Sequence, residues 1–373
     1  YKMNSKVLNF YSYLSARYQV KRDVWIDPTH KQEPVNIEIY YHKGHEYNLN
    51  VMVKSIKKSL DYFTQNFGPY QHKQARIIEF PRYETFAQSF PNTIPYSEGI
   101  GFILKLDDEK AIDMVYYVTA HEIAHQWWGH QVVGCPVDGM TTFSESMAQY
   151  SALMVMEKEY GKAQMKRFLK YELNNYLRAR GREKEKEQAL LFNQNQLYLH
   201  YQKGSVVMYA LQDYIGENKV NAAMQKFISA YKFKAPPYPT ALDFYGFIER
   251  ETPDSLKSFV TDLFKKITLY NNECIEASAK EISKNNYLVK IKVSAQKYYA
   301  DSLGNETKVN MNDWVEVGAV DEKESLLFSK KIRLTKSPME VEFYVNQKPA
   351  KAGIDPMNKL IDRDSDDNLK SVN

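Results

Sequence analysis

The strongest constraint on this chain is a pair of histidines four residues apart, His121 and His125, with Glu122 between them. Apolar side chains recur at helical spacing through residues 111–120, so we expect the pair on a helix. Side chains at positions i and i+4 share one helix face, where two imidazoles can bind one Zn²⁺ at roughly 2.0–2.1 Å. Glu122 would then face a water on the ion. The pattern predicts a catalytic zinc site.

A tetrahedral catalytic zinc site takes three protein ligands and a water, so a third ligand is needed. Glu145 is the leading candidate, with nineteen residues between it and His125, at the start of the next expected helix. Glu145 could instead form a capping box with Thr142 at that helix start. His130 is a rival ligand that lies off the shared helix face, and Asp138 is a second rival in a flexible linker.

The composition is that of an ordinary globular protein. Hydrophobic residues make up 43% and charged residues 26% of the 373 residues, with a net charge of +4 from well-mixed charges. This balance argues against a nucleic-acid or membrane face. Two cysteines, Cys135 and Cys274, imply no disulfide framework, and whether they pair stays open. No apolar run approaches the ~20 residues of a membrane helix. The first residues lack a basic region followed by an apolar one, so no signal peptide is expected within this sequence.

Changes in periodicity divide the chain into segments. Alternation at 35–41 predicts a strand that ends a β-rich domain at residues 1–48. Helical spacing begins a second domain at residues 49–270, with a strand at 75–80, a turn-rich loop at 89–101 and a charged run at 178–187 interpreted as solvated. Helices are expected at residues 49–67, 163–180, 202–215, 219–231, 241–249 and 255–267. Short alternating runs predict a β-sandwich at 271–355, followed by a solvated, Asp-rich tail at 356–373.

The run His-Glu-Ile-Ala-His-Gln-Trp-Trp-Gly at 121–129, with Ser-Glu-Ser-Met-Ala-Gln-Tyr at 144–150, resembles the aminopeptidase N family of zinc metallopeptidases, the gluzincins. The resemblance covers approximately residues 30–350. It implies an α+β fold, with a thermolysin-like zinc peptidase catalytic domain flanked by the remnant of an N-terminal β domain and a C-terminal β-sandwich. It assigns His121, His125 and Glu145 as ligands of Zn²⁺ and Glu122 as the general base. Family members have eighteen residues before the Glu ligand, so a one-residue insertion is expected in the linker at 134–139.

The resemblance extends to two further site residues. The segment Tyr-Gln-Lys-Gly at 201–204 resembles the family's Tyr-x-Lys-Gly, whose tyrosine donates a hydrogen bond to the oxyanion, and this implies that role for Tyr201. His200 beside it is expected to be structural. Glu98 falls on the glutamate of Gly-x-Met-Glu-Asn, which holds the substrate's α-amino group. Gly99 and Pro95 replace the flanking Asn and Gly, so Glu98 as an ordinary turn carboxylate stays open.

These residues together predict a zinc-dependent aminopeptidase that acts on peptides and has no nucleic-acid partner. Two alternatives stay open: a zinc endopeptidase with an open cleft, and a non-catalytic peptide-binding domain. Similar domains occur in large bacterial membrane proteins. The resemblance therefore implies a membrane-embedded region in the full-length protein and a tether to a bacterial inner membrane through segments outside these residues.

Overall fold

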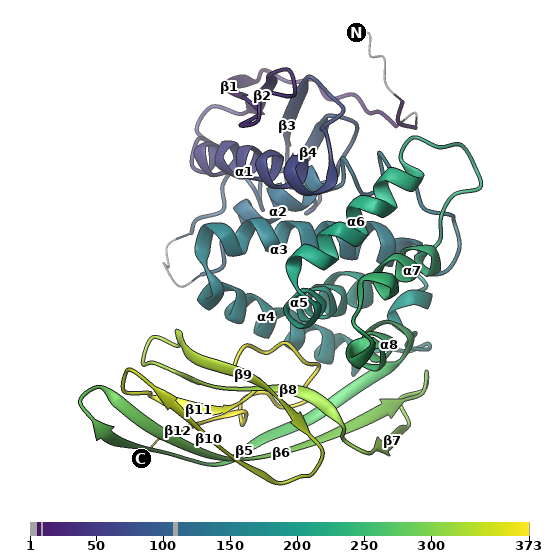
Figure 1. The fold of residues 1–373 in the computed structure, drawn as a ribbon. Coiled ribbons are helices and arrows are strands. Elements are labelled where there is room, and N and C mark those ends of the chain that lie inside the picture. Colours follow the sequence, from purple (N-terminus) through teal and green to yellow (C-terminus); the bar gives the residue numbers. More distant parts are fainter. Residues whose placement is uncertain (1–5, 9, 107–110, 373) are drawn as a thin grey trace. The chain divides into compact units, whose positions relative to one another are not determined.

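The computed structural model describes residues 6–8, 10–106 and 111–372, which form two compact units. The first unit comprises Tyr1–Glu159 and Ile215–Thr252, and the second comprises Tyr160–Tyr214 and Pro253–Asn373. Each unit is therefore built from two separate segments of the chain (Figure 1). Both units mix helices and strands, as the predicted α+β class requires.

The first unit contains a four-stranded sheet in the order β1-β2-β3-β4. Its strands are β1 (Gln19–Trp25), β2 (Val35–Tyr41), β3 (Gln74–Phe80) and β4 (Thr93–Ser97). β1 is antiparallel to β2, whereas β2, β3 and β4 run parallel. The expected domain boundary at residue 48 therefore falls inside this unit, because β2 pairs directly with β3. The residues of β4 were expected to form a loop, because Pro95 and the surrounding turn residues disfavour a strand. β4 is nevertheless a strand at the edge of the sheet, where a proline is tolerated.

The helices of the first unit include the predicted metal-binding helix. They are α1 (Leu49–Phe67), α2 (Met114–Ala124), the π-helical turn η1 (Thr142–Ser146), α3 (Met147–Tyr160), α6 (Glu217–Tyr231) and α7 (Ala241–Glu251). α1 confirms the predicted helix and ends before Gly68. Trp127 and Trp128, just beyond α2, are fully buried, and the Trp127 indole donates to the Gly68 carbonyl at 3.0 Å. Two aromatic side chains thus fix the end of α2 in the core.

The second unit combines helices with two four-stranded sheets. Its helices are α4 (Lys162–Arg180), the 3₁₀ turn η2 (Leu190–Phe192), the π-helical turn η3 (Tyr198–Lys203), α5 (Gly204–Ile215), the 3₁₀ turn η4 (Asp254–Leu256) and α8 (Lys257–Lys265). One sheet has the order β10-β6-β5 with β7 paired to β6, and the other has the order β12-β11-β8-β9. The strands are β5 (Ile267–Ser283), β6 (Asn286–Ala300), β7 (Glu306–Val309), β8 (Asp313–Val320), β9 (Leu326–Leu334), β10 (Met339–Val345), β11 (Lys351–Ile354) and β12 (Leu369–Ser371).

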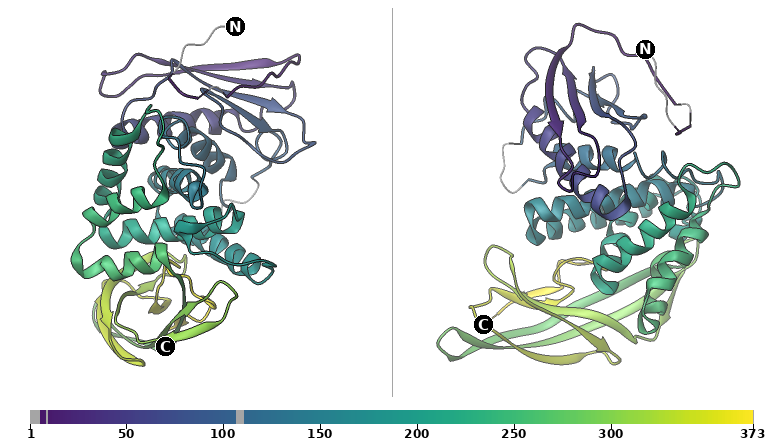
Figure 2. Two further views of the ribbon diagram at one scale, coloured as in Figure 1. Left: turned by 90° about the vertical axis from the view of Figure 1, so that its right-hand side faces the viewer. Right: turned by 45° about the horizontal axis from the view of Figure 1, so that its top comes forward.

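These two sheets face each other, as the green and yellow strands in Figure 2 show. At Gly353 on β11, an added Cβ would lie 2.0 Å from the carbonyl oxygen of Asn368, next to β12 in the same sheet, and 2.9 Å from the Cβ of Cys274 on β5 of the other sheet. Only glycine fits such a contact. Cys274 and Cys135 are both free thiols.

The prediction of a solvated tail at residues 356–373 is wrong for residues 356–362, which are buried, whereas Asp364 and Asp366 are exposed. Met357, Leu360 and Ile361 are buried, and β12 pairs with β11. Asp362 is fully buried and accepts hydrogen bonds from the backbone N–H groups of Asn272 and Asp364. The apolar residues that precede these aspartates anchor the segment in the sandwich. Within the described residues, no helix is long and apolar enough to cross a membrane.

Candidate metal centre

The structure brings the three predicted metal ligands together. His121 and His125 project from the end of α2 with their Nε2 atoms 3.0 Å apart. The Oε2 atom of Glu145 lies 3.3 Å from Nε2 of His121 and 3.2 Å from Nε2 of His125. All three side chains belong to the first unit and are largely shielded from solvent.

The three ligand atoms fit a Zn²⁺ ion. In a tetrahedral site with bonds of about 2.0–2.1 Å, ligand atoms lie about 3.3–3.4 Å apart, close to the spacing seen here. The Nδ1 of His125 lies 2.9 Å from the carbonyl oxygen of Trp128, to which it donates. This bond orients the ring and leaves Nε2 free to bind a metal. A cation at the common centre accounts for the approach of three electron-rich atoms.

Glu145 reaches the histidines from the π-helical turn η1, which precedes α3 without a break. The alternative capping role is not adopted: Thr141, not Thr142, is the N-cap residue, and the Glu145 carboxylate faces the two imidazoles. A π-helical turn contains about one residue more than an α-helical turn. The turn can therefore absorb the extra residue between His125 and Glu145 that was expected in the linker.

The two rival ligands lie outside this cluster. His130 is buried, and its Nε2 lies 3.0 Å from the carbonyl oxygen of Ser89. Burial lowers the pKa of His130 to about 4. Asp138 is exposed in the linker that precedes η1. The ligand set of two histidines and one glutamate is thus the one that the geometry favours.

Glu122 lies on α2 between the two histidines and is only 6% exposed. Burial raises the pKa of the Glu122 carboxyl, while His121, His125 and the backbone N–H of Ser89 act in the opposite direction. A raised carboxyl pKa suits a general base, because the group must hold and release a proton near neutral pH. The sequence did not predict this role for Ser89, because the residue lies in the turn-rich loop expected at 89–101.

The Glu145 carboxylate and the two histidines shift one another's pKa values. Burial opposes ionisation of Glu145, yet His125 and His121 hold its pKa well below the usual value. Although burial works against protonation of His125, the Glu145 carboxylate raises the pKa of that imidazole to about 9. A metal ion must therefore compete with a proton for His125.

Glu98 lies in a different cluster. Its carboxylate accepts a hydrogen bond from the Arg82 backbone N–H at 3.3 Å. Its carboxylate oxygens also lie within 4.8 Å of ligand atoms of His45 and Glu79. Glu98 is thus grouped with His45 and Glu79 and is not one of the three side chains that converge on the candidate metal centre.

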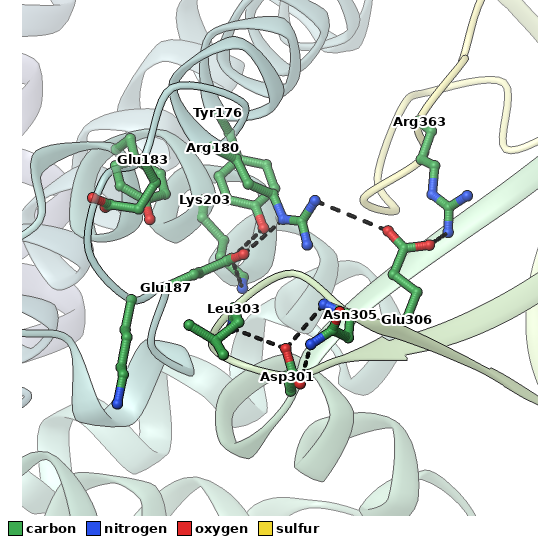
Figure 3. A network of polar contacts seen from close by, with 12 residues as sticks. Tyr176, Arg180, Glu183, Glu187, Lys203, Asp301, Leu303, Asn305, Glu306 and Arg363 are labelled. Carbon is green, nitrogen blue, oxygen red and sulfur yellow. Dashed lines mark hydrogen bonds and ion pairs between the residues drawn. The ribbon is translucent and has the colours of Figure 1, made fainter.

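Tyr201 lies on η3, in the second unit, and is half-buried. The neighbouring His200 is buried, with its Nδ1 3.0 Å from the side-chain nitrogen of Asn193. Lys203, at the end of the same turn, is buried and paired with Glu187 at 3.3 Å (Figure 3). The interpretation of residues 178–187 as solvated is therefore wrong for Glu187. Its buried carboxylate accepts hydrogen bonds from Tyr176, Arg180 and Lys203.

A model described as the Peptidase family M1 domain matches residues 47–263. The chain belongs to peptidase family M1. The match contains every residue of the candidate metal centre and Tyr201, and it overlaps the expected catalytic domain at 49–270.

Known proteins of similar sequence are considerably longer. A leucine aminopeptidase 2-1 of Meyerozyma guilliermondii is 26% identical over 207 residues, which cover 51% of this chain and 31% of that protein. A probable aminopeptidase 1 of Sulfurisphaera tokodaii is 22% identical over 197 residues, which cover 48% of this chain and 24% of that protein. The fold is shared with Legionella pneumophila aminopeptidase A, solved with aspartic acid. In that comparison the TM-score is 0.57 and the identity 15%, over 94% of this chain and 38% of the other.

Proposed function

We propose that this member of family M1 is a zinc-dependent peptidase that removes N-terminal residues from peptides. The observation that carries the proposal is the convergence of His121, His125 and Glu145 on one point, with the buried Glu122 beside them. The names of the two relatives, both aminopeptidases, support removal of N-terminal residues over internal cleavage. The intact Glu122 argues against a non-catalytic binding domain, which would not need a base.

Each residue has a distinct task in this proposal. Zn²⁺, when bound by the three ligands, would polarise the scissile carbonyl and make a water molecule acidic enough to react near neutral pH. Glu122 accepts the proton of the attacking water and then passes it to the leaving amine. Tyr201 donates a hydrogen bond to the carbonyl oxygen as negative charge develops there, a contribution of roughly 10²–10³ in rate for a typical donor.

The substitution Glu122→Gln tests this assignment. It removes the base and keeps the size of the side chain, so we expect kcat to fall by at least about 10²-fold. The zinc content, measured by atomic emission, should stay near that of the wild type, because Glu122 is not a ligand. Turnover at the wild-type rate by a metal-loaded Glu122→Gln protein would exclude Glu122 as the base.

The predicted role of Glu98 as the anchor of the substrate's α-amino group needs a separate test, since the carboxylate lies with His45 and Glu79. A set of peptides with free and N-acetylated termini separates the two peptidase types. An aminopeptidase cleaves only the free peptides, whereas an endopeptidase cleaves both. If Glu98 reads the amine, Glu98→Gln should raise KM for free peptides by at least about tenfold through loss of a charge-assisted pair. An unchanged KM in Glu98→Gln would show that another residue recognises the α-amino group of the substrate.

Attachment to a membrane is a further proposal, and it concerns segments outside these 373 residues. Fractionation of the full-length protein would test it, with recovery in the membrane pellet as the expected outcome.

A further inference from the structure

Lys203 is one of the most deeply buried charged side chains among the described residues, with 1% of the residue exposed. A buried ammonium group is costly unless it is paired. Its Nζ lies 3.3 Å from Oε1 of Glu187 and 5.2 Å from the centre of the Tyr176 ring. Burial lowers the pKa of Lys203, and Glu187 opposes that change. The burial of the Lys203 ammonium group therefore calls for a structural or functional explanation.

Glu187 joins three parts of the second unit. Its Oε1 accepts the Tyr176 hydroxyl at 2.6 Å, and its Oε2 accepts Nε of Arg180 at 2.6 Å, both from α4. Its backbone N–H donates to the carbonyl of Ser302 at 3.0 Å, in the turn that precedes β7. Figure 3 shows the side chains of Arg180 and Lys203 converging on this carboxylate. Lys203 therefore ties η3 to a rigid, multiply bonded anchor.

The anchored turn also contains Tyr201. At the start of η3, the Tyr198 ring stacks on Tyr176 with centroids 6.0 Å apart. At its end, Lys203 is held by Glu187. Tyr201 lies between these two attachment points and is only half-buried. π-helical turns are rare, and those that occur are often found at functional sites.

We propose that Lys203 is a positioning residue: its pair with Glu187 fixes the η3 turn and thereby the direction of the Tyr201 hydroxyl. The inference rests on the proposed function, in which that hydroxyl stabilises the oxyanion. Lys203 itself touches no substrate in this account. Its effect should therefore pass entirely through Tyr201.

A double-mutant cycle tests this route. Tyr201→Phe should lower kcat by roughly 10²–10³. Lys203→Met should lower kcat by about 10–10², since a misplacement of ~1 Å can cost about 10²-fold, and should change KM little. The double variant should match Tyr201→Phe, because a hydroxyl that is absent cannot be misdirected. Lys203→Arg, which keeps the charge, should restore part of the rate. Lys186→Met, at an exposed lysine beside Glu187, serves as the matched control and should leave kcat unchanged.

The possible failures differ in their signature. If Tyr201→Phe keeps the wild-type kcat, the role of Tyr201 in the proposed function is wrong, and the inference falls with it. If Tyr201→Phe is impaired but Lys203→Met lowers kcat by the same factor in both backgrounds, or not at all, only the positioning role is overturned. Should Lys203→Met not fold, as judged by its melting temperature, Glu187→Gln takes its place in the cycle with the same expectation.

Discussion

At the residue scale, the unusual groups of this protein are buried charges, and only some serve the metal centre. Glu122 and Glu145 lie within the candidate site, whereas Glu187 and Lys203 neutralise each other in the second unit. Glu172 on α4 differs from both pairs. It is 5% exposed, its Oε2 has no hydrogen-bond partner among the residues that the structure describes, and burial raises the pKa of its carboxyl to about 8.

This carboxyl makes stability depend on pH. Because the folded state holds the proton more tightly than the unfolded state, its contribution is complete below about pH 4.5 and is lost as pH rises toward 8. The loss can reach about 1.4 kcal/mol per pH unit in that window. Glu172→Gln stays neutral, so urea unfolding should show a smaller decline of the free energy of unfolding between pH 5 and 8. The variant should be the more stable protein at pH 8.5.

The control is Glu185→Gln, which removes an exposed carboxylate from the same unit. It should leave the pH dependence as in the wild type. Parallel pH profiles for wild type and Glu172→Gln would show that Glu172 ionises normally in the folded protein.

At the element scale, helix α2 begins with a cap that is remote from its metal-binding end. The Asp113 side chain accepts the backbone N–H of Tyr116 at 2.9 Å. Loss of an N-cap acceptor costs about 1 kcal/mol. Asp113→Ala should lower the free energy of unfolding by about that amount in urea, while Asp113→Asn should retain most of the bond. Zinc stoichiometry should be unchanged in both, since the ligands are two to three turns away.

Periodicity predicted several elements well and failed where tertiary contacts decide. The amphipathic spacing of α1 together with the stop at Gly68 predicted this helix, and the alternation of β2 predicted a half-buried strand. β4 is rich in turn formers, and its pairing with β3 was not visible in the local sequence. The site shows the same division. The spacing of His121, Glu122 and His125 is local information, whereas the contacts of Ser89 and Glu187 join segments that sequence alone does not bring together.

At the scale of the whole molecule, metal binding and stability should be linked. A ligand that binds only the folded state stabilises it by about 2.7 kcal/mol at 100 times its dissociation constant. Removal of zinc with a chelator should therefore lower the melting temperature, and added zinc should restore it. His125→Ala should abolish this dependence, because one of the three ligands is lost. A melting temperature that is independent of zinc in the wild type would show that the site does not bind the ion under those conditions.

The division into units also corrects the expected domain plan. Residues before 48 complete the sheet of the first unit, and residues after 355 complete the sandwich of the second. At residue 48 a strand was assigned to the segment in which its pattern occurs, although its partner β3 lies beyond the boundary. After residue 355 the Asp-rich composition hid the buried residues and the strand β12. The expected catalytic domain at 49–270 is also divided, because residues 160–214 and those from 253 onward belong to the second unit.

The wider turn that carries Glu145 has a consequence for how related chains are found. In this chain the carboxylate faces the imidazoles from a turn that contains an additional amino acid, so we expect that the count between His125 and Glu145 can differ by one among related chains. Searches that demand a rigid interval would overlook such chains. A pattern that tolerates one extra position, checked against the backbone of the turn, would recover them.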